Sequence, residues 1–447
     1  MRKCISSGVI MGLILILVMG ISLTVFAQKP VTIKIGHLYD PMGGPGVRLT
    51  YEWLGRVIKA FEAANPNIKV EQEIFQWDQI DVKAMADYRA GIKQHDVFFT
   101  SPQLMAQHNL VGDLLDLSPY IQSWPKKEIE DFSWSAAWAS GIFGKAQFSL
   151  PTGAHTRALV YRRDMFKQVG LDPNNPPRNL EELIACAKRL TRDTDGDKKT
   201  DVWGLGMYYG PSRATIELYF APFVWHYGGE LWDPKTKKAT FASDAGAKAA
   251  QFAYDVIYTH KITPEWAVSG TYDDDILRPF LDGKLGMAWG WGSYWISVLE
   301  DKGWLKGVFP PTPQGKPVIA DVAITPTAPQ AQFTNTWSLS IYKLSQHPKE
   351  AFKLIEFILK PENIIAYPDA GLPPRASLWQ KPELQTPFYQ TWRLAVAKGK
   401  GMPPTAHYGE LADTVAAALQ EILVNKAPIP KTLKKFEEEY NAQYAGE

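Results

Sequence analysis

Hydrophobic and polar residues follow two different periods in the segment from 31 to 100. Apolar residues alternate with polar ones over 31–35 and again over 68–74, which predicts two strands. Between them, apolar residues recur at helical spacing over 49–61, and Asn65-Pro66 ends the predicted helix. A strand, a helix and a strand in this order predict a parallel sheet with a right-handed crossover.

A third strand is predicted over 95–100, where an apolar centre indicates burial on both faces. Open parallel sheets bind ligands beyond the carboxyl ends of their strands. Trp77 follows the second strand and Ser101 follows the third, so we predict that both residues contact a ligand. The alternative is that both belong to ordinary strand-to-helix connections.

The remainder of the chain continues to mix strands and helices. Strands are predicted over 158–161, 202–207, 322–324 and 333–341, and helices over 245–258, 351–359, 411–423 and 433–444. No internal repeat is visible. A chain of 447 residues is too long for one hydrophobic core, so two or three domains are expected.

The stretch 280–295 contains a turn, a strand and a cluster of large rings. Apolar residues at 285–288 follow the turn and predict a buried strand. The rings that come next are interleaved with glycines; they belong to Trp289, Trp291, Tyr294 and Trp295. Glycine leaves the faces of neighbouring rings accessible, and rings spaced in this way pack poorly as core. We therefore predict a platform for the flat C–H face of a sugar, while core packing is the alternative for each single ring.

Composition narrows the class of protein. Hydrophobic residues make up 45% of the chain and charged residues 21%, which is typical of globular proteins. The 16 Trp and 19 Tyr suit a surface that binds flat, hydroxylated ligands. A formal net charge of +1 predicts neither a nucleic-acid-binding surface nor an anionic-membrane-binding one.

Residues 1–27 have the features of a signal peptide. Basic residues precede the apolar run 8–26, and Ala27 precedes Gln28 at the expected cleavage site. Because the run exceeds the ~7–15 residues of a usual signal core, an uncleaved membrane anchor is the alternative. Cleavage predicts a periplasmic or extracellular protein without a lipid-anchored N-terminal cysteine. Cys4 would be lost, which leaves Cys186 without a partner for a disulfide.

An acidic loop follows the helix predicted to carry Cys186. Its carboxylates alternate along the chain and belong to Asp193, Asp195, Asp197 and Asp201. This spacing matches positions 1, 3, 5 and 9 of a calcium loop, but Lys198 replaces the glycine of position 6 and Gly204 replaces the glutamate of position 12. A structural calcium site and an Asp-rich surface turn are both open interpretations.

Motifs of known catalytic sites are missing from the sequence. There is no G-x-S-x-G elbow, H-E-x-x-H pair or P-loop. The acids at 193–201 and 273–275 are better explained as a turn and a helix N-terminus than as a glycosidase pair. The 8 His are scattered along the sequence, so they do not form the clusters that bind soft metals. We predict a protein that is not an enzyme; a secreted carbohydrate-active enzyme and a metal receptor are the alternatives.

Several landmarks occur in an order that is specific when taken together. They are 158–166, 170–173, 180–183, 193–204, the pair Gly228-Gly229, 280–295, 337–341 and 371–375. In these features the chain after the signal peptide resembles the extracellular solute-binding proteins of ABC importers, in the maltose-binding-protein-like sugar-binding family 1.

The resemblance implies an α/β fold of the type II periplasmic-binding-protein kind, with two discontinuous lobes joined by a hinge. Residues 28–145 and 325–368 would form the first lobe, and residues 146–324 and 369–447 the second. The implied function is the capture of a sugar or oligosaccharide in an aromatic-lined cleft between the lobes. A monomer would then deliver the ligand to the permease subunits of an ABC transporter, without a cofactor apart from the calcium considered above. A receptor for a non-sugar solute is the alternative.

The resemblance also implies which side chains line the cleft. The family's aromatic positions map onto Trp225, Trp289, Trp291, Tyr294, Trp295 and Trp337. Thr156 and Tyr208 join these rings as expected ligand contacts. The family usually has two glycines before the last of these tryptophans, where this chain has Asn335 and Thr336 and therefore offers side chains that can form hydrogen bonds.

Overall fold

The predicted strand–helix–strand unit at the start of the chain is confirmed. In the computed structural model β1 (Val31–His37) and β2 (Ile68–Ile74) are parallel and are connected by α1 (Pro45–Ala64). After α2 (Ile80–Arg89), β3 (Val97–Thr100) pairs in parallel with the other side of β1. Every residue of β3 is buried, as its apolar centre predicted.

The structure describes residues 30–134, 136–270, 276–293, 296–301, 322–325, 333–369 and 372–446. The predicted signal peptide at 1–27 and the rings of Tyr294 and Trp295 lie outside these ranges. Within them, no helix combines the length and the apolar character needed to cross a membrane.

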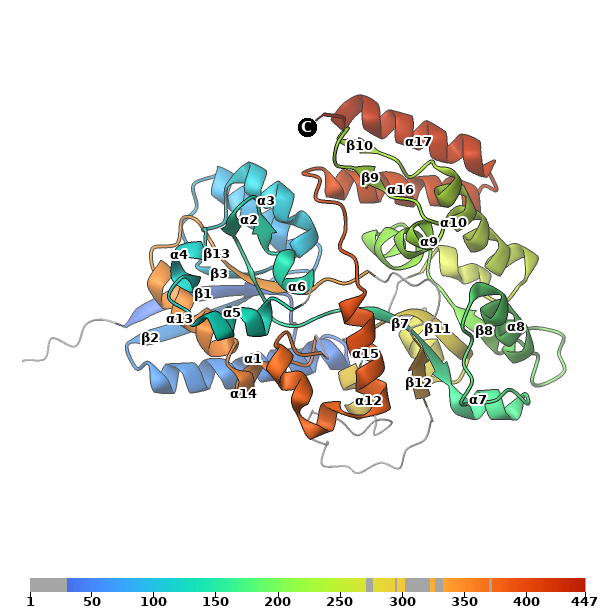
Figure 1. Ribbon diagram of the computed structural model, residues 1–447, viewed down its shortest axis with the longest axis horizontal. Coiled ribbons are helices and arrows are strands. Elements are labelled where there is room, and N and C mark those ends of the chain that lie inside the picture. Colours follow the sequence, from blue (N-terminus) through green and yellow to red (C-terminus); the bar gives the residue numbers. More distant parts are fainter. Residues whose placement is uncertain are drawn as a thin grey trace, which may run out of the picture.

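Two later segments complete the first sheet, whose strand order is β2-β1-β3-β13-β6. β13 (Ser338–Ile341) is antiparallel to β3, with Ser338 opposite Thr100. β6 (Leu150–Pro151) is antiparallel to β13. Figure 1 shows the blue strands of this sheet together with β13, so its centre is assembled from segments that are distant in sequence.

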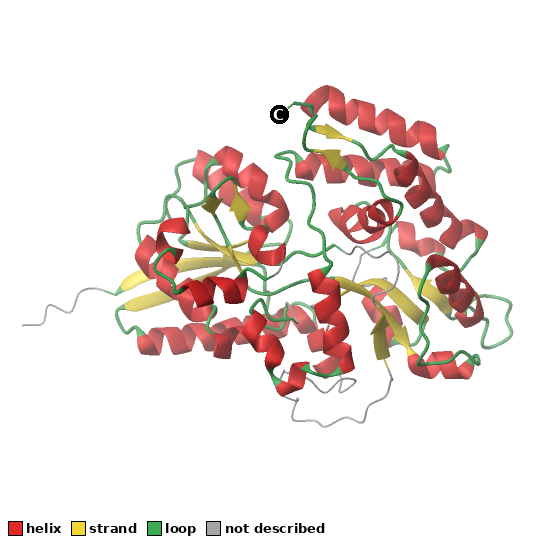
Figure 2. Ribbon diagram, in the orientation of Figure 1, coloured by secondary structure: helices red, strands yellow, loops and turns green. Residues whose placement is uncertain are grey.

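A second sheet has the strand order β12-β7-β11-β8. β7 (Arg157–Arg162) pairs antiparallel with β12 (Val322–Thr325) and with β11 (Leu285–Gly292). β8 (Trp203–Gly206) is parallel to β11. In Figure 2 helices accompany both sheets, which agrees with the predicted α/β class.

The remaining elements are helices and short strands. The further α-helices are α3 (Met105–Val111), α4 (Ser118–Ile121), α5 (Lys126–Phe132), α6 (Ala136–Ala139), α7 (Arg163–Gln168), α8 (Leu180–Leu190), α9 (Ala221–His226), α10 (Asp244–Tyr254), α11 (Arg278–Leu281), α12 (Ile296–Asp301), α13 (Pro348–Ile358), α14 (Pro361–Ile364), α15 (Pro387–Ala397), α16 (Tyr408–Leu423) and α17 (Ile429–Tyr444). Two-residue strands form the hairpins β4 (Ile142–Phe143) with β5 (Ala146–Gln147) and β9 (Trp232–Asp233) with β10 (Lys238–Ala239).

Single-turn helices connect several of these elements. The 3₁₀ helices are η1 (Pro102–Leu104), η4 (Glu265–Val268), η7 (Ala376–Gln380) and η8 (Pro382–Leu384). Two π-helical turns, η2 (Thr215–Phe220) and η3 (Asp255–Thr259), lie beside α9 and α10. π-Helical turns are rare and frequently occur at functional sites.

Each sheet lies in its own hydrophobic core. The first core joins α1 and β1–β3 to β13 and α13, so that Trp53, Phe98 and Ile355 are packed in one cluster. The second core joins β7, β8 and β11 to α9, α10, α16 and α17, with Leu159, Phe223 and Leu419 in one cluster. Burial of apolar surface, which contributes ~25 cal/mol per Å², holds each group of elements together.

Three chain segments lie side by side between the two sheets. His155 and Asn335 exchange backbone hydrogen bonds of 2.7 and 2.9 Å, and the Ala154 N–H donates to the Leu372 carbonyl at 3.1 Å. The first segment leads from β6 into β7, and the second leads towards β13. In Figure 1 the ribbons cross between the two groups of elements at this place. These crossing segments form the hinge of the predicted fold.

Candidate functional site

The carboxyl ends of β2 and β3 face elements that belong to the second core. Trp77 lies in the turn after β2, and 45% of its surface is exposed. The guanidinium of Arg213, just before η2, stacks on the Trp77 ring at 5.0 Å from its centre. Gln103, in η1 after β3, donates from Nε2 to Glu217 Oε1 at 3.3 Å. The two groups of elements therefore meet at the strand ends where the sequence predicted a ligand.

Glu217 is the buried carboxylate at this junction. It lies in η2 and is 8% exposed. Tyr408, at the start of α16, donates its hydroxyl to Glu217 Oε1 at 2.8 Å. Burial raises the pKa of Glu217, and the charge of Arg213 and the hydrogen bond from Tyr408 offset part of that increase. A carboxylate placed in this way can accept further hydrogen bonds from a bound molecule.

Three buried polar atoms at this junction have no hydrogen-bond partner among the described residues. They are Ser101 Oγ, Gln103 Oε1 and Arg213 Nη2. The first atom can donate and accept, the second accepts, and the third donates. Leaving such groups unpaired costs ~1–3 kcal/mol each. A molecule rich in hydroxyl groups would satisfy all three, because a hydroxyl both donates and accepts.

Within the stretch 280–295, the prediction that Trp289 contacts a ligand is wrong. The Trp289 side chain is 0% exposed, its Nε1–H donates to the Leu218 carbonyl at 3.1 Å, and its ring packs 5.3 Å from Phe223. Trp289 is thus corrected to a core residue, because alternation along β11 turns its ring towards α9. A bulge follows at Gly290, whose φ of 70° favours glycine. Trp291 pairs with Ala158 across this bulge.

The other predicted contacts are spread over several elements. Trp225 is partly buried at the end of α9, with Lys400 Nζ 5.1 Å from its ring centre. Trp337 is partly buried against the first core, just before β13. Thr156 Oγ1 lies 2.8 Å from Thr334 Oγ1 in the crossing segments, and Tyr208 is 3% exposed. The structure therefore places Thr156 and Trp337 at the hinge and Trp77 and Ser101 at the strand ends.

The sequence interpretation missed Arg213, Glu217 and Tyr408. One signal was available, because Glu217 is a lone carboxylate inside the apolar run 216–224. A charged residue on a buried helix needs a partner, because burying an unpaired charge is costly, and such a residue is therefore a functional candidate. No comparable signal marks Tyr408, which reaches Glu217 only through the tertiary fold.

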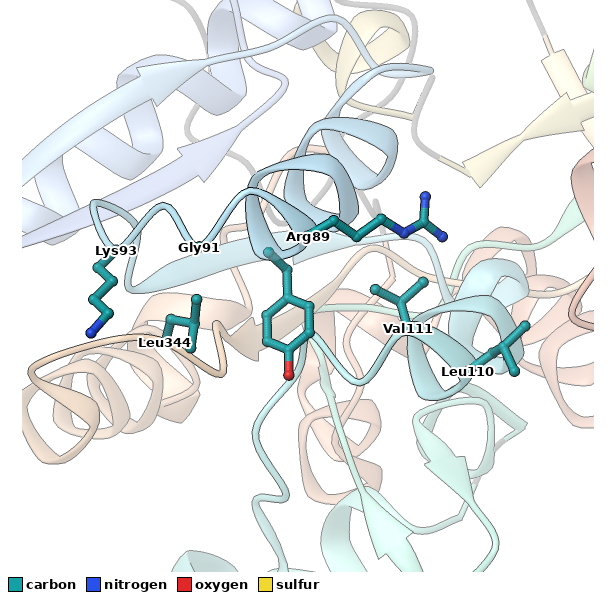
Figure 3. Close-up of a pocket in the computed structure, with 7 residues that line it drawn as sticks. Arg89, Gly91, Lys93, Leu110, Val111 and Leu344 are labelled. Carbon is teal, nitrogen blue, oxygen red and sulfur yellow. The ribbon is translucent and has the colours of Figure 1, made fainter.

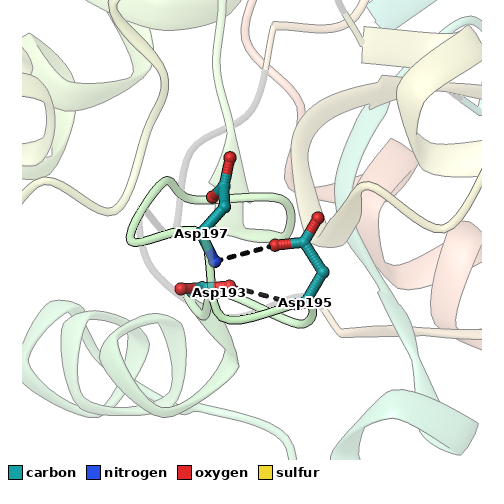
Figure 4. Close-up of side chains that lie close together, drawn as sticks. All are labelled: Asp193, Asp195 and Asp197. Carbon is teal, nitrogen blue, oxygen red and sulfur yellow. Dashed lines mark hydrogen bonds between the residues drawn. The ribbon is translucent and has the colours of Figure 1, made fainter.

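The acidic loop connects α8 to β8 and is closed by its own hydrogen bonds (Figure 4). Asp193 Oδ1 accepts from the N–H groups of Asp195 and Gly196, and Asp193 Oδ2 accepts from Lys198 N–H at 2.7 Å. The bond from Gly196 is the main cause of the lowered pKa of Asp193.

The loop keeps features of a cation site. Oxygen atoms of Asp193, Asp195 and Asp197 lie within 4.8 Å of one another, whereas Asp201 accepts from Thr194 instead. Lys198 takes a φ of 66°, which lets a lysine fill the place of the usual glycine. The three exposed carboxylates fit a hard cation. Calcium binding here stays a prediction.

A hollow elsewhere on the first group of elements contains none of the predicted site residues (Figure 3). It is lined by Tyr88, Arg89, Gly91, Lys93, Leu110, Val111 and Leu344. Its polar groups come from the end of α2 and its apolar ones mostly from α3. None of the residues that line this hollow has an unpartnered buried polar atom of the kind found at the strand ends.

Comparisons with known proteins agree with the geometry. The family model for bacterial extracellular solute-binding proteins matches residues 48–365. A protein named as the periplasmic-binding protein of an amino-acid ABC transporter in Sinorhizobium fredii is 24% identical over 337 residues, which are 75% of this chain and 72% of that protein.

Two solved structures share the fold. The ABC transporter solute-binding protein of Thermotoga lettingae, bound with α-D-tagatose, has a TM-score of 0.77 at 22% identity and covers 93% of this chain and 99% of its own. A maltose-bound protein of T. maritima has a TM-score of 0.75 at 21% identity, over 92% and 98% of the two chains. The type II periplasmic-binding-protein fold is confirmed.

Proposed function

The chain belongs to the bacterial extracellular solute-binding protein family, and from this premise we propose that it captures a sugar or oligosaccharide for an ABC transporter. The observation that carries the proposal is the set of unpartnered buried atoms on Ser101, Gln103 and Arg213. These atoms include both hydrogen-bond donors and acceptors, and a hydroxyl group can pair with either kind, whereas an apolar solute can pair with neither. The half-exposed Trp77 ring adds a flat face for the C–H side of a sugar.

Capture would proceed by closure of two lobes. We assign residues 28–145 and 325–368 to the first lobe and residues 146–324 and 369–447 to the second. A ligand that touches Ser101 in one lobe and Arg213 in the other favours the closed form, because only that form offers both contacts. The hydrogen bond from Gln103 to Glu217 and the stack of Arg213 on Trp77 are the interlobe contacts that closure would maintain.

The closed monomer would then dock on the permease and release its ligand unchanged. A glycosidase needs two carboxyl groups ~5–9.5 Å apart on either side of the bond that it cleaves. Glu217 has its Oε1 engaged by Tyr408 and Gln103, which suits binding better than proton transfer. Export by the segment 1–27, with cleavage before Gln28, places the protein outside the cytoplasmic membrane.

A binding panel tests the proposal. We expect D-tagatose or maltose to raise the melting temperature and to give a saturable isotherm by calorimetry, whereas L-leucine does neither. A ligand at ~100 times its dissociation constant stabilises the fold by about 2.7 kcal/mol. Binding of L-leucine with no response to either sugar would favour the non-sugar receptor, and turnover of a bound glycoside would favour the enzyme.

A further inference from the structure

A buried histidine lies beneath the strand end that carries Ser101. His108, in α3, is 0% exposed. Its Nε2 lies 2.9 Å from Asp81 Oδ1, and its Nδ1 lies 2.9 Å from Asp113 Oδ2. Asp81 is 2% exposed and Asp113 is 0% exposed. Both ring nitrogens therefore face carboxylates, and only the protonated imidazolium can donate to both.

This buried triad reaches the candidate site through Asp81. Asp81 Oδ1 also accepts from the backbone N–H of Ser101 at 3.0 Å. Ser101 precedes η1, which carries Gln103 and continues into α3 with His108 itself. Two of the three unpartnered atoms at the junction, Ser101 Oγ and Gln103 Oε1, thus belong to a segment that the triad ties to α2.

We propose that His108 is a positioning residue for ligand binding. Asp113 holds one ring nitrogen of His108, and the other ring nitrogen holds Asp81. Asp81 in turn holds the segment of Ser101 and Gln103 in the position where a ligand contacts it. The inference rests on the proposed function, since it explains how the same site is kept in shape. No contact between His108 and the ligand is needed, because its influence passes through one carboxylate and one backbone N–H.

The chain contains a matched control in the same sheet. His95 is 1% exposed and also lies between two carboxylates, with Nε2 2.8 Å from Asp87 and Nδ1 2.8 Å from Glu73. His95 precedes the amino end of β3, whereas Ser101 follows its carboxyl end. Replacing His95 removes a buried imidazole and its hydrogen bond to the buried Asp87, beside the partly exposed Glu73, without touching the ligand-facing end of the strand.

The protonation state of His108 makes the hydrogen bonds of this triad depend on pH. A neutral imidazole carries one N–H, so on losing its proton His108 can donate to Asp81 or to Asp113 but not to both. Burial opposes the charge, but the hydrogen bonds that His108 donates to Asp113 and Asp81, together with the charges of these carboxylates, outweigh it and raise the pKa of His108 to about 9. Tyr342 faces Asp113, and its pKa of about 12 lies above this range.

The experiment compares His108→Gln with His95→Gln in the full chain. The first readout needs no ligand and is the hydrogen exchange of the Ser101 amide. We expect faster exchange in His108→Gln and unchanged exchange in His95→Gln. The second readout is the dissociation constant for D-tagatose and for maltose, which we expect to rise about tenfold in His108→Gln at pH 7 and to stay within twofold in His95→Gln. Both variants lower the melting temperature.

A second experiment measures the dependence of binding on pH in Asp113→Asn. This variant also tests the proposal if His108→Gln fails to fold. An amide N–H at position 113 can donate to Nδ1, so that a neutral His108 keeps its Nε2–H for Asp81. Wild-type affinity should hold from pH 6 to 8 and weaken towards pH 10, whereas Asp113→Asn should bind equally at pH 7 and pH 10.

Wild-type Ser101 exchange and affinity in His108→Gln would overturn the positioning role, as would equal pH profiles in wild type and Asp113→Asn. If neither sugar binds, the proposed function fails, while the exchange of the Ser101 amide still decides whether His108 positions it.

Discussion

At the scale of single residues, the type of a side chain was predictable but its exposure was not. Trp77 and Trp289 were both expected to meet a ligand, yet Trp77 is 45% exposed and Trp289 is 0% exposed. Whether a ring faces a core depends on the helices that cover its strand, here α9 over β11, and these helices are distant in sequence. The N-cap of α8 is different: Asn179 Oδ1 accepts from Glu182 N–H at 2.8 Å, and the spacing of Asn179 and Glu182 is enough to predict this, because capping depends only on neighbours in the sequence.

Trp77→Ala should weaken binding of the active sugar by roughly threefold to tenfold, because it removes one ring face of about 0.5–1.5 kcal/mol. Isothermal calorimetry measures the change. Trp266→Ala is the control, since Trp266 is similarly exposed at 38% but lies in η4, away from the strand ends. Equal affinities in the two variants would remove Trp77 from the site.

The stability of the fold should fall at alkaline pH because of His108. Its folded pKa of about 9 exceeds the unfolded value of ~6.5, so its contribution is complete below pH 6.5 and is lost as the pH rises through 9. Urea unfolding between pH 6.5 and 9.5 should show a decline on the order of 1–3 kcal/mol in wild type. His108→Gln should lack this decline, and parallel curves would contradict the assignment.

At the scale of elements, the hydrophobic pattern located most helices and strands. The predicted strands at 31–35, 68–74 and 285–288 correspond to β1, β2 and β11. The pattern did not reveal the bulge in β11, where a Cβ on Gly290 would lie 3.0 Å from the Tyr219 ring. Nor did it reveal the π-helical turn η2, because period-based reasoning assumes the α-helical spacing throughout.

The acidic loop between α8 and β8 yields a prediction about calcium. About 1 mM CaCl₂ should raise the melting temperature, and Asp195→Asn should abolish the shift, because hard oxygen ligands bind calcium. Asp233→Asn is the control, since Asp233, at the end of β9, is another aspartate that accepts from a backbone N–H, that of Lys235 at 2.9 Å. A melting temperature that calcium leaves unchanged would identify the loop as a self-contained turn.

At the scale of the whole molecule, the order of the landmarks indicated the fold, while the contacts of the site could not be predicted. Gln103 and Glu217 are separated by 114 positions, and Glu217 and Tyr408 by 191. No local period links residues so far apart, and only the packing of the two sheets around the crossing segments brings them together. A resemblance to a family predicts the order of strands more readily than it predicts side-chain contacts between distant residues.

Ligand binding should make the whole molecule more compact. Small-angle scattering of the full chain with saturating D-tagatose or maltose should give a smaller radius of gyration than the protein alone, because closure brings the lobes together. L-Leucine, which we expect not to bind, serves as the control. An unchanged radius with a sugar that does bind would argue against hinge closure.

The late position of β13 in the first sheet has a consequence for the newly synthesised chain. The sheet lacks this strand until residue 341 has left the ribosome, and the second core lacks α17 until residue 444 has followed. The first core, which extends to Leu378, can therefore be completed only after most of the chain has emerged, and the second core only after α17 has emerged. For most of the time that the chain takes to emerge, the first sheet lacks one of its central strands and the second core lacks its last helix.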